Sequence, residues 1–199
     1  MKLITSILIA SLAFFTTSQA AVKTGAAAPE FTVMDSTGAE HSLSDFKGKY
    51  VMLEWTNHTC PFVKKFYKNG EMQALQSEMT AKDVVWLQVL SSAEGKSGYL
   101  TALNAELMRT KQKVHSTALL LDANGKIGRA YGARTTPHMF LIDPEGTVIY
   151  QGAIDSIKSA NSQDIAAATN YVKAAYASAI VGELIQKSTT TPYGCGVKY

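Results

Sequence analysis

The fold is decided by the stretch Tyr50-Val-Met-Leu-Glu-Trp-Thr-Asn-His-Thr-Cys60-Pro-Phe-Val63. Its first six residues are mainly apolar and have the length of a strand, which predicts a strand covered on both faces in the middle of a sheet. Pro61 suits the first turn of a helix, and apolar residues at three- and four-residue spacings extend that helix to about Met79, with a break allowed near Asn69-Gly70. Cys60 therefore lies between a buried strand and a helix.

Strand and helix patterns alternate along the rest of the chain. Strands are predicted over residues 31–34, 41–43, 84–90, 118–121, 139–142 and 147–151, and helices over about 99–112, 126–131 and 162–182. The first two strands and the last two are each close enough to form a hairpin. This order predicts an α/β fold with a mixed central sheet, helices on both of its faces and an N-terminal β-hairpin. The last segment, 186–199, is expected to be extended and irregular.

Composition limits the class of protein. The chain has 199 residues, of which 46% are hydrophobic and 18% charged, and these values fit one ordinary globular domain. Its two cysteines, Cys60 and Cys195, are too few for a disulfide scaffold or a four-thiolate zinc site. The formal net charge is +3 and no basic run exceeds Lys64-Lys65, so no nucleic-acid partner is predicted.

The first twenty residues have the pattern of a secretory signal. Lys2 precedes an apolar run, and small residues ending at Ala20 follow it. The run has about 13 residues, fewer than the roughly 20 that span a membrane, which disfavours the alternative of a membrane anchor. We therefore predict a signal peptide over 1–20, a domain over 21–185 and a cysteine-containing tail over 186–199. The protein is expected to be exported, periplasmic or extracellular, and free of the membrane after cleavage.

The position of Cys60 before a helix favours a reactive thiol. Unpaired amides at a helix N-terminus carry partial positive charge, which favours the thiolate and lowers a cysteine pKa. The alternative is a buried cysteine that acts only as a small apolar residue.

Two motifs carry a resemblance to a known family: Glu54-Trp-Thr-Asn-His-Thr-Cys60-Pro-Phe-Val63 and Gly132-Ala-Arg-Thr-Thr-Pro137-His-Met-Phe-Leu-Ile-Asp143. With them the chain resembles the thioredoxin superfamily from about Ala28 to Gly152, and within it the exported redoxins grouped with the AhpC/TSA peroxiredoxins. The resemblance implies a thioredoxin-like fold. It also implies that Pro137 is a cis-proline beside Cys60, and that Pro137 and the Thr136 backbone shape a substrate groove.

The chain departs from the family at two motifs. Val63 stands where thioredoxins have the second cysteine of Cys-x-x-Cys, so local dithiol exchange is excluded. Leu53 and Asn57 stand where peroxiredoxins have proline and threonine, which puts peroxidase activity in doubt. Asn57 and Thr59 could still hydrogen-bond a substrate, and Arg134 could balance a thiolate or polarise a peroxide.

The resemblance also suggests roles for Glu54 and Cys195. Glu54 stands six residues before Cys60, where thioredoxins keep a buried proton-shuttling acid, although strand alternation could instead turn it to solvent. The 13 residues from Gly182 to Cys195 could span about 40 Å, whereas the radius of gyration of such a domain is about 16 Å. Cys195 can therefore reach Cys60. It is a resolving thiol, half of a permanent structural disulfide, or a free or intermolecular thiol.

The sequence thus predicts an exported thiol-dependent oxidoreductase that acts by thiol–disulfide exchange or as a thiol peroxidase. The predicted catalytic residues are Cys60, Cys195 and Glu54, and the predicted substrate-binding residues are Thr136, Pro137, Asn57, Thr59 and Arg134. We expect a disulfide-containing protein or a peroxide as substrate and an unidentified thiol reductant. No cofactor or metal is expected, since His58 and His138 lack metal-site spacing. The alternative is a non-catalytic thioredoxin-fold binding module with a structural Cys60–Cys195 disulfide.

Overall fold

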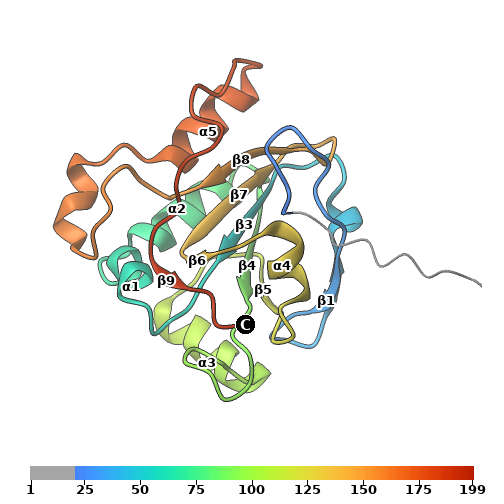
Figure 1. Ribbon diagram of the computed structural model, residues 1–199, viewed down its shortest axis with the longest axis vertical. Helices are drawn as coiled ribbons and strands as arrows, with labels where there is room; N and C mark the ends of the chain where they lie inside the picture. Colours follow the sequence, from blue (N-terminus) through green and yellow to red (C-terminus); the bar gives the residue numbers. More distant parts are fainter. Residues whose placement is uncertain (1–20) are drawn as a thin grey trace, which may run out of the picture.

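A computed structural model describes residues 21–199. Its centre is a five-stranded sheet in the order β5-β4-β3-β7-β8 (Figure 1). The strands are β3 (Val51–Trp55), β4 (Val85–Leu90), β5 (Ala118–Leu121), β7 (His138–Ile142) and β8 (Val148–Gly152). Strand β4 runs parallel to β3 and β5, whereas β7 runs antiparallel to β3 and β8. The predicted mixed sheet, with β3 in the middle, is confirmed.

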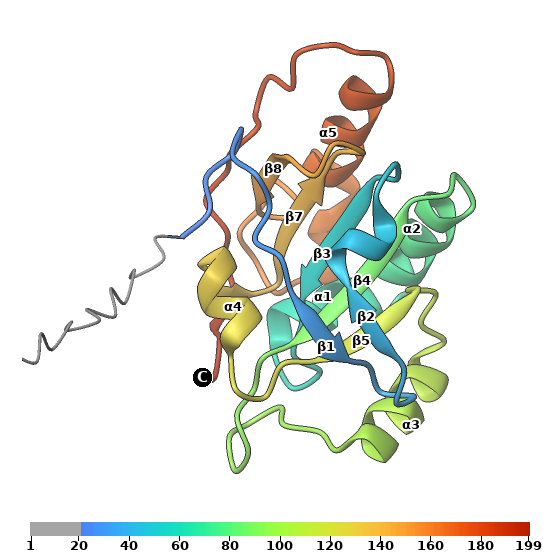
Figure 2. The same cartoon turned by 90° about the vertical axis from the view of Figure 1, so that its right-hand side faces the viewer.

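Helices and a hairpin cover the two faces of this sheet (Figure 2). One face carries α1 (Pro61–Tyr67), α2 (Glu71–Thr80) and α5 (Tyr171–Ile180). The other carries α4 (Lys126–Tyr131), the predicted hairpin of β1 (Thr32–Met34) with β2 (Glu40–Ser42), and the 3-10 helix Leu43–Phe46. Helix α3 (Ala102–Gln112) buries only Ala105. The break expected near Asn69-Gly70 separates α1 from α2, and Gly70 there has a φ of +84°.

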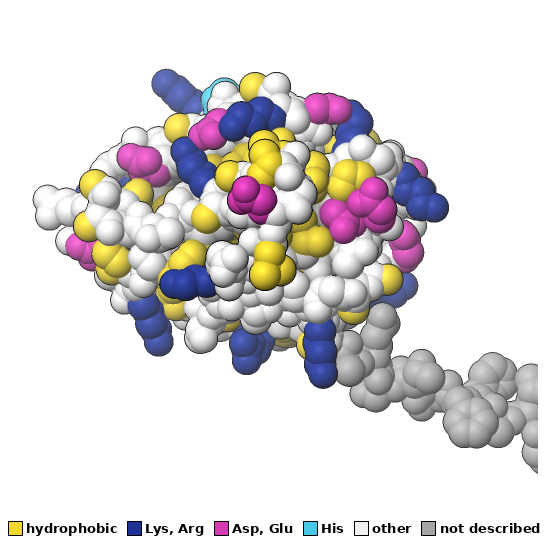
Figure 3. All heavy atoms as spheres, turned by 90° about the horizontal axis from the view of Figure 1, so that it is seen from above, with side chains coloured by type: hydrophobic (Ala, Val, Ile, Leu, Met, Phe, Trp, Pro, Cys, Tyr) yellow, Lys and Arg dark blue, Asp and Glu magenta, His cyan; other side chains and the backbone are white. Residues whose placement is uncertain are grey.

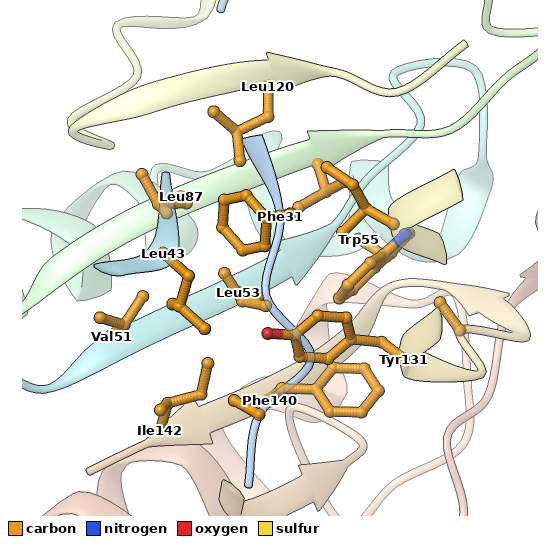
Figure 4. Close-up of a cluster of buried hydrophobic side chains, with 14 of the residues drawn as sticks. Phe31, Leu43, Val51, Leu53, Trp55, Leu87, Leu120, Tyr131, Phe140 and Ile142 are labelled. Atoms are coloured by element: carbon orange, nitrogen blue, oxygen red, sulfur yellow. The ribbon is translucent and has the colours of Figure 1, made fainter. Parts of the chain in front are cut away.

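Strand β3 contributes side chains to both faces of the core. Val51, Leu53 and Trp55 lie in the cluster drawn in Figure 4, and Met52 lies in the cluster on the opposite face. The Trp55 indole is fully buried and its Nε1 donates a hydrogen bond to Ser91 Oγ at 3.0 Å. Because both faces are packed, the carboxyl end of β3 is a rigid base for the loop that leads to Cys60.

The single helix predicted over 162–182 is wrong. The segment forms a 3-10 helix, Ser162–Ala167, and then α5, which begins at Tyr171. Asn170 interrupts the helix because its side chain accepts a hydrogen bond from the Lys173 amide at 3.0 Å and so caps α5. The sequence on either side of Asn170 is rich in alanine, so its pattern does not reveal that α5 begins there. Helix α3 likewise begins later than expected, after its cap Thr101.

The prediction of an irregular tail is only partly right. Residues Cys195–Gly196 form strand β9, which pairs antiparallel with β6 (Thr135–Thr136). In Figure 1 the tail, in red, leaves α5 and passes β6 before it ends near α4. Its last residue is held as well, since the Tyr199 hydroxyl donates to the Ala133 carbonyl at 2.7 Å. Much of segment 186–199 is thus packed on the domain.

The predicted signal peptide, 1–20, lies outside the described residues. Within residues 21–199, no helix combines the length and the apolar character that a membrane crossing requires.

Candidate active site

Cys60 is the N-cap residue of α1, and its side chain is buried. The Cys60 amide donates to the Asn57 carbonyl at 3.0 Å, and the Cys60 carbonyl accepts from the Lys64 amide at 2.9 Å. Pro61, the first helical residue, has no amide hydrogen and fits a position where that hydrogen would lack a helical partner. The loop and the helix therefore fix the Cys60 backbone on both sides of its thiol.

A second element, the loop around Pro137, lies against the Cys60 thiol. The Thr136–Pro137 peptide bond is cis, as the family resemblance implies. The Thr136 carbonyl oxygen is 3.1 Å from Cys60 Sγ. Thr136 also faces Cys195 in the β6–β9 pair, so this short strand lies beside both cysteines.

The two cysteines are in direct contact. Their Sγ atoms are 2.7 Å apart although the two residues are 135 positions apart in the chain. The predicted reach of Cys195 to Cys60 is therefore confirmed. Gly194 makes this approach possible: it has a φ of +144°, and a Cβ at this position would overlap the Thr136 carbonyl.

The two thiols differ in acidity. Burial is the largest single influence on Cys60 and raises its pKa. Hydrogen bonds from the Cys195 thiol, the Val63 and Cys195 amides and the Thr136 side chain together outweigh it, so the pKa lies below its ordinary value. Burial also raises the pKa of Cys195, and the hydrogen bond to Cys60 and the Cys60 charge raise it further, to about 11. Of the two thiols, Cys60 is therefore the one that loses its proton first as pH rises.

Glu54 lies in β3 and is completely buried, which confirms the buried alternative over the solvent-facing one. Its carboxylate accepts hydrogen bonds from Tyr67 Oη at 2.7 Å, Trp86 Nε1 at 2.8 Å and Gln76 Nε2 at 3.0 Å. Burial raises the pKa of Glu54, and these donors offset part of that effect. Among the hydrogen bonds of the described residues, none joins Glu54 to either cysteine.

Three predicted substrate-binding residues lie in different settings: Asn57 and Thr59 in the loop before Cys60, and Arg134 just before β6. Asn57 is buried and engaged within the protein: Oδ1 accepts from the Thr59 amide at 2.9 Å and Nδ2 donates to the Ser97 carbonyl at 3.1 Å. Thr59 and Arg134 are exposed. The Arg134 carbonyl accepts from the Val197 amide of the tail at 3.1 Å. Their part in substrate binding stays a prediction.

A buried cluster that the sequence did not reveal holds the tail beside Cys60. Lys65 Nζ contacts Asp155 Oδ2 at 2.7 Å and Tyr193 Oη at 3.0 Å. Lys64 and Lys65 are adjacent on helix α1. The apolar neighbours Val63 and Phe66 are the only sequence signal that one of these two lysines faces the protein interior.

His138 is buried against Phe140, with ring centroids 4.5 Å apart. Burial and then Arg134 lower its pKa to about 3, so it is a neutral side chain in the core. Within residues 21–199, no group of three or more histidine, cysteine or acidic side chains is arranged to hold a metal ion.

Comparisons with known proteins show which relatives this chain resembles. One similar relative is the thiol-disulfide oxidoreductase ResA of Geobacillus thermodenitrificans (strain NG80-2). It is 27% identical over 141 residues, which cover 67% of this chain and 71% of that protein.

Solved structures show the fold. A hypothetical protein from Sinorhizobium meliloti 1021 matches with a TM-score of 0.75 at 20% identity, over 90% of this chain and 96% of that chain. The thioredoxin domain of a thiol-disulfide oxidoreductase from Bacteroides vulgatus matches with a TM-score of 0.52 at 23% identity, over 66% of this chain and 89% of that chain. The fold is therefore thioredoxin-like.

The family is identified from the part of the sequence that forms the first hairpin and the central sheet. A model of the AhpC/TSA family matches residues 24–151, which include Cys60, the Pro137 loop and four of the five central strands in full. The chain belongs to the AhpC/TSA family.

Proposed function

We propose that this protein is a thiol-disulfide oxidoreductase in which Cys60 attacks the substrate and Cys195 resolves the product. The observation that carries the proposal is the 2.7 Å contact between the Sγ atoms of Cys60 and Cys195, with the pKa of Cys60 lowered and that of Cys195 raised. The activity named for the ResA relative supports the same reaction class.

In the first step the Cys60 thiolate attacks one sulfur of a substrate disulfide. A bond forms between Cys60 and that sulfur, the substrate S–S bond breaks, and the second substrate sulfur leaves as a thiolate that takes a proton from solvent. The thiolate is the reactive form, so the lowered pKa of Cys60 increases the fraction of protein that can react at neutral pH.

In the second step Cys195 attacks Cys60 in the mixed disulfide. Cys195 loses its proton, the Cys60–Cys195 bond forms, and the remaining substrate sulfur leaves as a thiol after protonation. The substrate disulfide is reduced to two thiols and the protein dithiol is oxidised to one disulfide. The negative charge of Cys60 and the hydrogen bond between Cys195 and Cys60 raise the pKa of Cys195 only while Cys60 is a thiolate. Once Cys60 is bonded to substrate, both effects end and Cys195 becomes easier to ionise.

A protein disulfide is a better-supported substrate than a peroxide. The positions at which the family resemblance places a peroxide-orienting proline and threonine hold Leu53 and Asn57. The Asn57 side chain is also committed to Thr59 and Ser97 within its own loop. A disulfide needs no such group, because its attack requires only a thiolate and an accessible sulfur.

Glu54 is proposed to exchange protons with the site. Burial raises the pKa of Glu54 toward neutral pH, and a carboxyl with such a pKa is suited both to donate and to accept a proton. Thr136 and Pro137 are proposed to guide an extended substrate backbone, because β6 lies directly beside Cys60.

We place the reaction outside the cytosol. The secretory-signal pattern of residues 1–20 supports this location, and an exported protein works where disulfides persist. A separate thiol reductant would return the Cys60–Cys195 bond to two thiols after each turnover.

The experiment that tests the proposal measures thiol loss in the reduced protein after addition of a disulfide-containing protein and, separately, of hydrogen peroxide. Wild type is expected to lose two thiols with the disulfide substrate and to form the Cys60–Cys195 bond, whereas Cys60→Ser should not react. If Cys60→Ser reacts as fast as wild type, or if Cys60 reacts no faster than free cysteine, the proposal fails.

The alternative function is a binding module in which the Cys60–Cys195 bond is structural. Such a bond would have a reduction potential below about −300 mV and resist glutathione, while a redox pair would be more oxidising. A redox titration separates the two functions.

A further inference from the structure

Lys65 is a lysine with no solvent exposure. Its side chain lies on α1, five residues after Cys60, and its relative exposure is 0%. Nζ contacts Asp155 Oδ2 at 2.7 Å, the Ile157 carbonyl at 3.0 Å and Tyr193 Oη at 3.0 Å. A buried ammonium group is costly unless it is paired and hydrogen-bonded, and here three oxygens face it.

The cluster joins three segments that are distant in the chain. Lys65 belongs to the helix that Cys60 begins, Asp155 to the segment after β8, and Tyr193 to the tail, two residues before Cys195. The Tyr193 hydroxyl also donates to Asp155 Oδ1, and its ring packs edge-on against Phe62 with centroids 5.8 Å apart. Polar and aromatic contacts thus bind the tail to α1 immediately before the second cysteine.

We propose that Lys65, Asp155 and Tyr193 are positioning residues that hold Cys195 against Cys60. This inference rests on the proposed function, because it explains how the resolving thiol is kept in place. Among the hydrogen bonds of the described residues, none joins these three side chains to either sulfur, so they act through the tail. The β6–β9 pair holds the tail at Cys195 itself, and the Lys65 cluster holds it two residues upstream.

A fixed tail has a measurable consequence. Two thiols held in contact react as if one were present at very high concentration near the other, and this effective concentration falls when the tether gains freedom. Release of Tyr193 would leave the tail held on one side by β9 and the last residues, and on the other by the hydrogen bonds of Ser188 and Thr190 to Gln151. Cys195 would then spend less time at Cys60, and mixed disulfides on Cys60 would last longer.

The test measures the effective concentration of the Cys60–Cys195 pair in glutathione buffers. In this equilibrium the protein dithiol and oxidised glutathione give the protein disulfide and two reduced glutathiones, and mass spectrometry of quenched samples gives the ratio. Tyr193→Phe removes one hydroxyl from the cluster and is expected to lower the effective concentration roughly tenfold, as expected for a hydrogen bond to a charged group. Asp155→Asn, which leaves the Lys65 charge unpaired, is expected to lower it further.

Tyr50→Phe is the matched control. It also removes one tyrosine hydroxyl, whose hydrogen bond goes to the Ala179 carbonyl at 3.2 Å and does not involve the tail. This variant should keep the wild-type effective concentration, and urea unfolding of all three variants shows how much each change costs in stability.

The outcomes separate the two claims. If Tyr193→Phe is folded and retains the wild-type effective concentration, the positioning role is overturned, even if Asp155→Asn fails to fold. If Tyr50→Phe lowers the effective concentration as much as Tyr193→Phe does, the effect is a general loss of stability and the positioning role is again overturned. If wild type forms no reversible Cys60–Cys195 bond with glutathione, it is the proposed function that fails.

Discussion

At the residue scale, Cys60 shows how burial and hydrogen bonding compete at one sulfur atom. Burial alone would raise its pKa, and the reverse occurs because four hydrogen bonds, from the Cys195 thiol, the Val63 and Cys195 amides and the Thr136 side chain, favour the thiolate. Two of these, the thiol and the amide of Cys195, come from the tail. The acidity of Cys60 therefore depends on a residue 135 positions away in the sequence.

Substitution of Cys195 by alanine tests this dependence. Cys195→Ala removes the thiol that donates to the Cys60 thiolate, so the pKa of Cys60 is expected to rise. The rate of Cys60 alkylation, measured as a function of pH, should show its midpoint at a higher pH than in a wild-type sample kept reduced. Cys195→Ser retains a hydroxyl donor and is the control, with a midpoint closer to that of wild type. An unchanged midpoint in Cys195→Ala would show that the tail does not tune Cys60.

The sequence predicts some of these residues better than others. Cys60 can be recognised because a buried strand, a cysteine and a helix-starting proline follow one another. Glu54 was ambiguous because strand alternation decides which way it points, and only packing against Tyr67 and Gln76 settles that direction. Lys65 could not be recognised, since a lysine beside another lysine has the pattern of a solvated helix surface.

At the element scale, the short β6–β9 pair is what brings the two cysteines together. Each strand has only two residues, too few for a recognisable sequence pattern, and the pairing joins the tail to a loop about 60 residues earlier. Strands β3, β4 and β7 were predictable because each is a longer apolar run. The division between the 3-10 helix and α5 was not, because it depends on a local cap at Asn170.

Two glycines on either side of Cys195 provide a matched test of this pairing. Gly194→Ala would push a methyl group into the Thr136 carbonyl, at a backbone conformation that favours glycine, and is expected to cost about 1–3 kcal/mol and separate the thiols. Gly196→Ala meets no atom within 4 Å and should behave like wild type. Urea unfolding and the rate of Cys60–Cys195 bond formation are the measurements. Equal behaviour of the two variants would contradict the assigned role of Gly194.

At the scale of the whole molecule, the fold buries polar groups beneath an ordinary surface. On the face in Figure 3, basic and acidic side chains are interspersed with hydrophobic ones, in keeping with the formal net charge of +3. Charged side chains that are rarely buried lie in the protein interior, among them Glu54, Lys65 and Asp155. Composition was therefore a fair guide to the class of protein and gave no information about the site.

The buried carboxyl of Glu54 should affect global stability as a function of pH. Folding raises the pKa of Glu54 above its unfolded value of about 4.3. At pH values between the unfolded and the folded pKa, the native state therefore binds more protons than the unfolded state. Stability contributed by this group is then lost as pH rises through that window. The stability advantage of wild type over Glu54→Gln should decrease with rising pH, as measured by urea unfolding across the acidic and neutral range.

Glu78 is the control of opposite sign for this experiment. Hydrogen bonds from Lys173 and Lys82 lower its pKa, so its contribution is present above the unfolded pKa and lost as pH falls. The advantage of wild type over Glu78→Gln should therefore decrease with falling pH. A Glu54→Gln difference that does not vary with pH would mean that Glu54 titrates alike in the folded and unfolded states.

The central claim is that Cys60 attacks first and Cys195 resolves, and the most direct measurement is the identity of the first covalent adduct. Reduced protein is mixed with a disulfide-containing protein, quenched with acid within one turnover and mapped by mass spectrometry. We predict a lasting mixed disulfide on Cys60 in Cys195→Ala, no adduct in Cys60→Ser, and the Cys60–Cys195 bond in wild type. A first adduct on Cys195, or no adduct in Cys195→Ala, would contradict the account.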